Sequence, residues 1–332
     1  MLPSMRTPWI NFGLLLCATA FSLALMEMTS RFVYPISAGP KFITSDGREL
    51  NSWNEPGRTY RQVSSEYNAI TNITGKGYRI PEVQGNPDVI FIGDSCTFGV
   101  GLGDKETFPF QYALSKKVTC ANLASPDWGT GEEIDRLEEA LSDWGWRPRH
   151  VMLFMFAMTT SMAGGNDIVD NLAYGRKDRS DRLLKRVAQK QSTLWGNIYN
   201  YLRYQVLFSS NLARILKFHL GSQVRSAVSL RIDEQPLKQS LELTRRQLLR
   251  LQHLSDVYGF SYEIFLIHPV QDIVRGTADH TQQALQSISP VPIWDTAHLF
   301  SKNPTDYYYA YDGHPNARGS AAIAQFLLSR NK

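Results

Sequence analysis

Two short stretches of the chain carry residues that together can do nucleophilic chemistry. The tripeptide at 93–95, Gly-Asp-Ser, places a serine in a tight turn, and Asp-Gly-His at 312–314 places an acid and a base two residues apart. A serine hydroxyl is a poor nucleophile until a base takes its proton and a third group orients that base. One loop can hold the His314 imidazole with Nδ1 toward Asp312 and Nε2 toward Ser95. We therefore predict Ser95 as nucleophile, His314 as general base and Asp312 as the acid that orients it.

The serine follows an apolar run of the kind that forms a buried strand. Residues 88–92, Asp-Val-Ile-Phe-Ile, end directly at the Gly-Asp-Ser turn. Further strand-like runs alternate with helical stretches: strands at 118–122, 150–157, 261–267 and 291–294, helices at 108–116, 131–144, 237–258 and 317–329. This alternation predicts an α/β fold, a three-layer α/β/α sandwich with a parallel central sheet. Functional residues of such sheets lie at the carboxyl ends of the strands, where Ser95 and the 312–314 loop both fall.

The N-terminus carries a long apolar run. Residues 9–26, WINFGLLLCATAFSLALM, have only mild polar interruptions. As a helix they span about 27 Å, close to the thickness of a bilayer core. Arg6 and the amino terminus precede the run, so we expect a transmembrane helix with a cytoplasmic N-terminus and an exported remainder, periplasmic or extracellular. The alternative is a cleaved signal peptide and a secreted protein, because Ala18-Thr19-Ala20 has the form of a cleavage site.

The composition argues against two other kinds of site. A net charge of +4 without a Lys/Arg stripe indicates no nucleic-acid partner. The three cysteines match no zinc spacing, and we expect neither a metal nor a cofactor. Cys96 and Cys120 are interpreted as small buried hydrophobes, with a bridge between them as the alternative. His268, after the strand at 261–267, is interpreted as a packed histidine.

The chain divides into three expected parts. Residues 1–30 form the membrane anchor (or signal peptide) with a short cytoplasmic tail, and residues 31–85 form a linker with a small capping segment. Residues 86–330 form the catalytic domain, in which the basic and aromatic stretch at about 172–235 is interpreted as a helical insertion.

Two blocks of the sequence resemble a known family. The segment 91–101, FIGDSCTFGVG, resembles the first block of the SGNH (GDSL-like) hydrolases, in a branch reading Gly-Asp-Ser-x-Thr-x-Gly. The segment 312–319, DGHPNARG, is similar to the last block, which supplies the acid and histidine of the triad. Thr-Phe-Pro at 107–109 and Gly-Lys-Gly-Tyr-Arg at 75–79 also resemble that branch. The resemblance extends over about residues 68–328 and implies an SGNH, flavodoxin-like fold and ester chemistry, in a membrane-anchored bacterial branch.

The resemblance also implies an oxyanion hole made of three donors. These are the serine N–H, a backbone N–H from a second block and an asparagine side chain from a third, which stabilise the tetrahedral intermediate. The Ser95 amide is the first candidate. Asp127 stands where the second block should have a glycine, and Gly129 follows two residues later. Asn166 is the third candidate, although it follows its strand by more residues than the pattern has.

The expected function is ester chemistry on an exported substrate. We expect a serine esterase or O-acyltransferase acting on acyl esters, acetyl above all, of a cell-surface or exported glycan. The expected partners are an acylated small-molecule or glycan substrate, the membrane through the N-terminal helix, and proteins of the envelope. The alternative is a catalytically weak or inactive relative that binds glycan or a partner in an envelope assembly complex. Asp127 and the stretched third block motivate that alternative.

Overall fold

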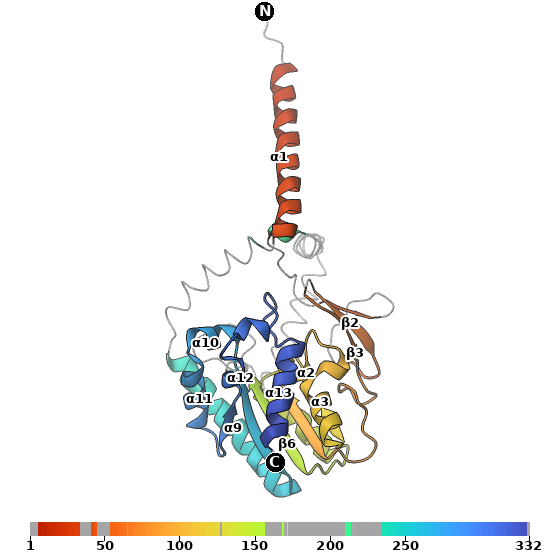
Figure 1. Ribbon diagram of the computed structural model, residues 1–332, viewed down its shortest axis with the longest axis vertical. Helices are drawn as coiled ribbons and strands as arrows, with labels where there is room; N and C mark the ends of the chain where they lie inside the picture. The colour runs from red at the N-terminus through yellow and green to blue at the C-terminus, as the bar shows by residue number, and fades with distance from the viewer. Residues whose placement is uncertain are drawn as a thin grey trace, which may run out of the picture. The chain divides into compact units, whose positions relative to one another are not determined.

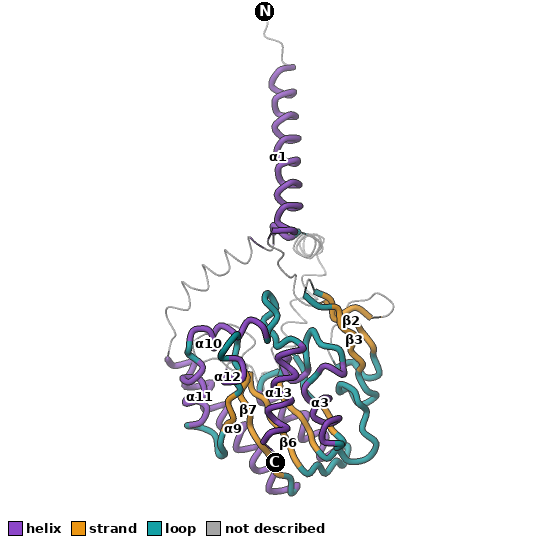
Figure 2. Tube along the Cα trace, in the orientation of Figure 1, coloured by secondary structure: helices purple, strands orange, loops and turns teal. Residues whose placement is uncertain are grey.

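The structure, a computed structural model, describes most of the chain outside residues 172–233 (Figures 1 and 2). The described residues are 6–33, 41–44, 54–64, 66–126, 128–156, 168, 171, 210–213, 215 and 234–330. The chain divides into two compact units, residues 1–38 with 182–227 and residues 39–181 with 228–332. Most of the predicted insertion at 172–235 therefore lies outside the described residues.

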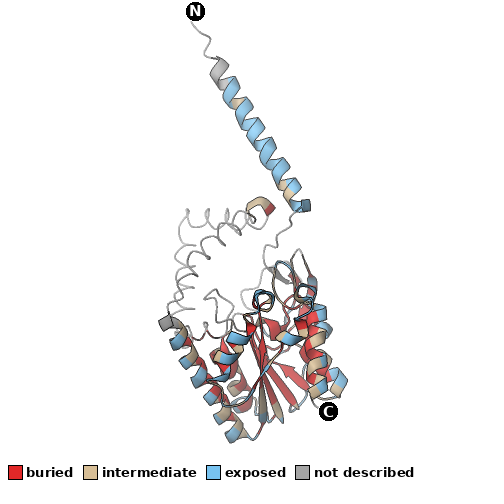
Figure 3. Ribbon diagram, turned by 60° about the vertical axis from the view of Figure 1, so that its left-hand side comes forward, coloured by how far each residue is buried: buried red, intermediate tan, exposed pale blue. Residues whose placement is uncertain are grey.

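The first unit contains helix α1 (Arg6–Val33). Its segment Ile10–Val33 is the one helix, among the described residues, that is long and apolar enough to cross a membrane. Its side chains are exposed around almost the whole circumference, as the pale blue ribbon in Figure 3 shows. A helix with apolar side chains on every side needs an apolar environment on every side. The sequence prediction of a long apolar N-terminal helix is confirmed.

Glu27, near the end of α1, joins this helix to a short segment of the insertion. Its carboxylate accepts hydrogen bonds from the amides of Asn211 and Leu212, at 2.7 and 2.9 Å, and from the Ser210 hydroxyl at 2.8 Å. Residues 211–213 are helical, and amides in a first helical turn have no partner within their own helix. Glu27 therefore supplies, from another helix, the acceptors that this turn lacks.

A five-stranded parallel sheet forms the centre of the second unit. Its strands lie in the order β5-β4-β6-β7-β8 and are β4 (Val89–Gly93), β5 (Cys120–Asn122), β6 (His150–Phe156), β7 (Ser261–Ile267) and β8 (Ile293–Asp295). Because β5 and β6 flank β4 on opposite sides, the chain order reverses there. The carboxyl end of β4 is thus the topological switch point, where ligands bind in open α/β sheets.

Helices cover both faces of the sheet, so the predicted three-layer α/β/α sandwich is confirmed. One face packs against α4 (Thr130–Ser142), α9 (Glu234–Tyr258) and α11 (Ala278–Gln286). The other packs against α3 (Phe108–Lys116), α10 (Val270–Arg275), α12 (Ala297–Phe300) and α13 (Ala317–Arg330). Successive strand residues point to opposite faces, so Ile90 packs against the first layer and Phe91 against the second. Cys96 and Cys120 are both buried and are not joined by a disulfide, so the alternative of a bridge between them is wrong.

A small antiparallel sheet lies outside the sandwich, within the segment predicted to cap the domain. It contains β1 (Lys41–Thr44), β2 (Thr59–Val63) and β3 (Asn68–Asn72) in that order. Residues 64–67 connect β2 to β3, and Ser64 organises this turn. Its amide donates to the Tyr67 carbonyl at 2.9 Å, and its hydroxyl accepts from the Glu66 amide at 3.0 Å. The remaining short helical turns are α2 (Ser95–Phe98), η1 (Asp104–Glu106) and η2 (Pro304–Asp306).

Candidate active site

Ser95 begins helix α2 immediately after the carboxyl end of β4. Asp94 is the N-cap of this helix, and its Oδ1 accepts a hydrogen bond from the Cys96 amide at 2.9 Å. The chain turns close to strand β6 here, since a Cβ placed on Gly93 would lie 2.6 Å from the Phe154 carbonyl oxygen. Gly93 has no side chain to prevent this close approach, and Ser95 therefore lies at the switch point of the sheet.

The structure brings Ser95, His314 and Asp312 together. His314 Nε2 lies 2.8 Å from Ser95 Oγ, and His314 Nδ1 is hydrogen-bonded to Asp312 Oδ1. The side chain of Asp312 is 4% exposed and that of His314 is 24% exposed. The base is thus reachable from solvent while its acid partner is shielded from it.

The loop that carries the acid and the base is fastened on both sides. The Gly313 amide donates to the Tyr309 carbonyl at 3.1 Å, and the Tyr309 amide donates to the His314 carbonyl at 2.9 Å. Asn316 then caps helix α13, because its Oδ1 accepts from the amides of Arg318 and Gly319. The Asp-Gly-His stretch therefore lies between a closed turn and a capped helix, which limits its freedom to move.

Electrostatics favour the tautomer that a general base needs. Burial raises the pKa of Asp312, but hydrogen bonds from His314 and Tyr67, together with the positive charge that His314 carries when it is protonated, outweigh it, so the pKa lies below its usual value. An ionised carboxylate only accepts hydrogen bonds, so the proton between the two residues belongs to Nδ1 of His314. When the imidazole is neutral, Nε2 is then its unprotonated nitrogen, and it accepts from the Ser95 hydroxyl.

A second acceptor lies beside the serine hydroxyl. Asp94 Oδ2 is 3.1 Å from Ser95 Oγ, compared with 2.8 Å for His314 Nε2. A hydroxyl has one proton and donates to one of these acceptors at a time. Proton transfer to the base requires the orientation toward His314, which has the shorter distance.

The oxyanion side is only partly within the described residues, and its assignments stay predictions. Asp127 and Asn166 lie outside them. The Gly129 amide donates to Glu132 Oε2 at 3.2 Å as part of the N-terminal cap of α4. The loop after β5 does lie next to the serine turn, because the Ser125 amide donates to the Gly93 carbonyl at 3.2 Å. The Ser95 amide is in the first turn of α2, where helix amides have no partner within the helix.

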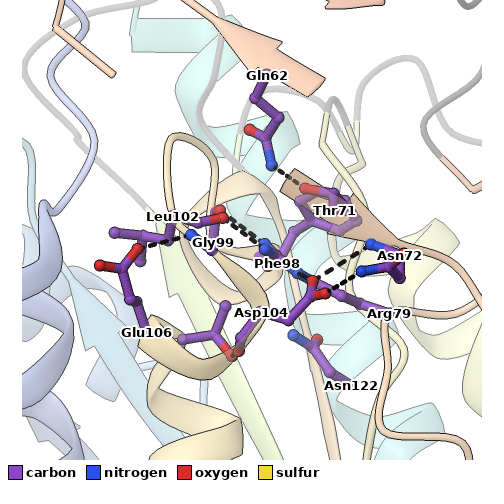
Figure 4. A network of polar contacts seen from close by, with 12 residues as sticks. Gln62, Thr71, Asn72, Arg79, Phe98, Gly99, Leu102, Asp104, Glu106 and Asn122 are labelled. Carbon is purple, nitrogen blue, oxygen red and sulfur yellow. Dashed lines mark hydrogen bonds and ion pairs between the residues drawn. The ribbon is translucent and has the colours of Figure 1, made fainter. Parts of the chain in front are cut away.

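A buried arginine, whose role the sequence did not reveal, holds the loop that follows Ser95 (Figure 4). The Arg79 guanidinium is fully buried and pairs with Asp104 at 2.8 Å. It also donates to three carbonyls of the loop: those of Phe98, Gly99 and Leu102. Removing one partner of a buried ion pair leaves an uncompensated charge, at a cost of about 3–5 kcal/mol. Arg79 therefore fixes the segment between the nucleophile and η1.

Sequence reasoning also missed the hydrogen bond that Tyr67 makes to the loop of residues 312–314. The Tyr67 hydroxyl donates to Asp312 Oδ2 at 2.9 Å, across a separation of 245 residues. No local spacing signals a contact between residues so far apart. The available signal was weaker, an aromatic residue in the turn of a short hairpin.

A second histidine–aspartate pair lies at the same edge of the sheet. His268 follows β7 and its Nε2 lies 2.9 Å from Oδ1 of Asp295, the last residue of β8. The His268 side chain is fully buried, and its Nδ1 has no hydrogen-bond partner among the described residues. Its carbonyl accepts from the Tyr308 hydroxyl at 2.9 Å. The structure thus places His268 in the core, as a packed histidine.

Comparisons with known proteins give distant likenesses. No protein-family model and no curated protein sequence matches the chain. Similar solved structures include the esterase EstA from Pseudoalteromonas sp., with 11% identity over 73% of this chain and 94% of EstA and a TM-score of 0.39. A variant of the acetyl-xylooligosaccharide esterase Axe2 from Geobacillus stearothermophilus has 15% identity, coverage of 75% and 95%, and a TM-score of 0.37. A carbohydrate esterase with catalytic and non-catalytic binding functions has 10% identity, coverage of 89% and 85%, and a TM-score of 0.38. These sequence identities and TM-scores are too low to place the chain in a family. The candidate site is therefore inferred from the geometry of this chain alone.

Proposed function

We propose that this chain is a serine esterase or O-acyltransferase of the SGNH type. The single observation that carries the proposal is the hydrogen-bonded series Asp312–His314–Ser95 at the switch point of the sheet. In this series an ionised acid fixes the imidazole tautomer, and the unprotonated imidazole nitrogen faces a serine hydroxyl. That is the arrangement that activates serine for attack on an acyl group.

The reaction follows from this geometry in two halves. Ser95 Oγ attacks the carbonyl carbon of the ester while its proton passes to Nε2 of His314, and Asp312 stabilises the imidazolium. The tetrahedral intermediate collapses to an acyl-serine, and the proton on Nε2 leaves with the alcohol. A second hydroxyl then loses its proton to His314 and attacks the acyl-serine, and Ser95 Oγ leaves and takes the proton back from Nε2. Water in that role makes an esterase, and a sugar hydroxyl makes an acyltransferase.

A glycan is the proposed carrier of the acyl group. A cavity of about 470 Å³, which none of Ser95, Asp312 and His314 lines, includes one residue of the loop after β5, the loop that pairs with the serine turn. Trp128 and Trp144 line this cavity, together with polar side chains that include Asn54 and Glu132. Aromatic rings beside hydrogen-bonding groups suit sugars, which have apolar ring faces and hydroxyl edges. We propose short acyl groups, acetyl above all, as the transferred group.

The membrane is the proposed location. Helix α1 has the length and composition of a span, and Arg6 precedes it. The positive-inside rule then orients the N-terminus toward the cytoplasm and the second unit toward the exported side. Glycans of the cell surface are exported to that side of the membrane, so enzyme and substrate would meet there.

The core claim is tested with the full chain in detergent micelles and a small aryl acetate. We expect release of the phenol by the wild type and a loss of about 10⁴-fold or more in kcat for Ser95→Ala. A matched control is Ser301→Ala, which removes an exposed hydroxyl far along the chain from Ser95. Equal turnover by wild type and Ser95→Ala would reject the catalytic assignment.

The alternative is a binding protein that keeps the triad but turns over slowly. The engagement of the Gly129 amide by Glu132 favours it, because one oxyanion candidate is committed elsewhere. A fluorophosphonate probe separates the two functions, since it forms a stable bond to an activated serine. Labelling of Ser95 that is lost in His314→Ala supports the enzyme. No labelling, together with retention of glycan by the full chain in a pull-down, supports the binding protein.

A further inference from the structure

The hairpin β2–β3 reaches from the small sheet to the catalytic loop. Tyr67, at the end of the turn between these strands, donates its hydroxyl proton to Asp312 Oδ2 at 2.9 Å. The other oxygen of this carboxylate bonds His314. The two oxygens of one carboxylate are thus divided between a phenol and the imidazole.

Glu66, the residue before Tyr67, holds the backbone of the same loop. Its carboxylate accepts from the Asp312 amide at 2.8 Å and from the Tyr311 amide at 3.1 Å. The backbone amide of Asp312 is therefore bonded to Glu66 and its side chain to Tyr67, and these are two consecutive residues of one hairpin turn. Such a double attachment limits rotation of the carboxylate relative to the imidazole.

The position of the Tyr67 ring is itself fixed. The ring is buried and packs against Tyr309, with 4.9 Å between ring centroids. Gly101, which has a φ of +80°, allows this packing, since a Cβ there would lie 2.6 Å from the Tyr309 ring and 2.8 Å from the Tyr67 ring. The Tyr309 hydroxyl donates to the Gly101 carbonyl at 2.9 Å and not to Asp312. Two tyrosines thus share one packing site, and one of them bonds the catalytic acid.

We propose that Tyr67 is a positioning residue of the active site, which acts on His314 through Asp312, with Glu66 as its partner in holding the loop. This inference rests on the proposed function, because it assigns a role within the same triad. It extends the series of hydrogen bonds to Tyr67–Asp312–His314–Ser95, with its first member outside the α/β sandwich.

The hydrogen bond from Tyr67 lowers the basicity of the Asp312 carboxylate. Burial and the neighbouring Asp312 charge raise the pKa of Tyr67, so the phenol stays protonated and remains a donor. The hydrogen bond from the phenol partly neutralises the negative charge of the carboxylate, so the carboxylate stabilises the imidazolium less strongly. Without the donor, Asp312 stabilises protonated His314 more strongly and also orients it less well. The charged groups that face this pair are the carboxylates of Asp94, beside Ser95, and of Glu66, beside the Asp312 amide.

The test is the pH dependence of Ser95 labelling by a fluorophosphonate, with the full chain in detergent micelles. In Tyr67→Phe we expect the midpoint of the acid limb to move upward by about one pH unit and the plateau rate to fall by about tenfold. In Tyr309→Phe, which loses a hydroxyl from the same packing site, the midpoint should not move. In Glu66→Gln the midpoint should move downward by a smaller amount, because a negative charge near the imidazolium is lost.

A cycle with Asp312→Asn separates a positioning role from a purely structural one. With Asp312 replaced, Tyr67→Phe should no longer move the midpoint, because its effect passes through the carboxylate. An unmoved midpoint in Tyr67→Phe, or an equal shift in Tyr309→Phe, would overturn the inference.

Titration of the His314 imidazole by NMR decides the same question without turnover or labelling. The seven histidines of the chain allow assignment by comparison with His314→Gln. If the wild type fails to label at Ser95, the proposed function fails while the titration still tests Tyr67. If Tyr67→Phe does not fold, the opposite shift expected in Glu66→Gln provides the test, and its absence would count against the inference.

Discussion

Among the residues that the structure describes, two histidine–aspartate pairs lie at one edge of the sheet, and they differ in what surrounds them. His314 is 24% exposed and bonded to both Asp312 and Ser95. His268 is fully buried, with its Nε2 bonded to Asp295. Both imidazoles have an ionised partner, because the pKa of each aspartate lies below its usual value: burial raises it, and hydrogen bonding and charge from the histidine outweigh that effect.

The difference shows that a histidine–aspartate pair alone does not make a catalytic base. A general base needs a free nitrogen that faces a proton to be taken, and access for the substrate that supplies the reacting atoms. His314 has both, since Nε2 faces the serine and the side chain is partly exposed. His268 is shielded from solvent, so its pair contributes to the packing of the ends of β7 and β8.

The largest expected difference between the pairs is in activity. His314→Ala should lower kcat for an aryl acetate by about 10⁴-fold or more, because the imidazole that takes the serine proton and passes it to the leaving alcohol is lost. His268→Ala should lower it by less than about tenfold, since His268 does not face the reacting atoms. Both variants are assayed as full chains in detergent micelles. Similar losses in the two variants would mean that both pairs belong to the machinery.

The loss of unfolding free energy should have the reverse order, larger for His268→Ala than for His314→Ala. His268→Ala leaves a mostly buried Asp295 carboxylate without its side-chain donor, together with a cavity, and should cost about 2–4 kcal/mol of unfolding free energy. His314→Ala should cost less than about 1 kcal/mol, because the imidazole itself is partly exposed and Tyr67 still bonds Asp312. Thermal unfolding followed by near-ultraviolet circular dichroism measures both. A larger loss for His314→Ala would invert the comparison.

Acid should affect the two pairs alike. The folded-state pKa of Asp312 and of Asp295 is depressed, so their stabilisation is fully present above the unfolded value of about 3.9. It is lost as the pH falls below that value and through the folded values. Asp312→Asn and Asp295→Asn should therefore each flatten the fall in melting temperature between about pH 5 and pH 3. A wild-type slope in either variant would show that its pair does not contribute.

The smallest expected effect is that of Ser95→Ala on stability. The serine hydroxyl bonds a partly exposed histidine, and its removal should change the unfolding free energy by less than about 0.5 kcal/mol. The contrast with its large effect on turnover would mark Ser95 as a residue kept for chemistry. A melting temperature lowered as far as in His268→Ala would assign Ser95 a structural role instead.

Much of the fold followed from local patterns in the chain. The apolar runs at 150–157 and 261–267 became β6 and β7 almost residue for residue, because buried parallel strands are continuous apolar segments. The acidic start of the helix predicted at 131–144 marks the first turn of α4. The short spacing of Asp312 and His314 placed both in one loop, where their side chains now meet.

The small sheet and its contacts were not predictable in this way. Residues 31–85 lack a strong period, so the sequence predicted a linker with a small capping segment but not the pairing of strands β1 to β3. The bonds from Tyr67 to Asp312 and from Arg79 to the loop after Ser95 join residues far apart in the chain. No sequence window contains both members of such a pair.

The sequence by itself determined the strand-helix alternation, the long apolar N-terminal helix and the chemical identity of Ser95, Asp312 and His314 as a potential set. These depend on residue type and local spacing, which govern burial, hydrogen-bonding capacity and the direction of the chain. Only the tertiary structure decided that His268 pairs with Asp295 at the same edge of the sheet, and that a hairpin tyrosine shares the acid. Those outcomes depend on distance and solvent access in three dimensions, since an imidazole becomes a base only where a proton donor and an opening reach it.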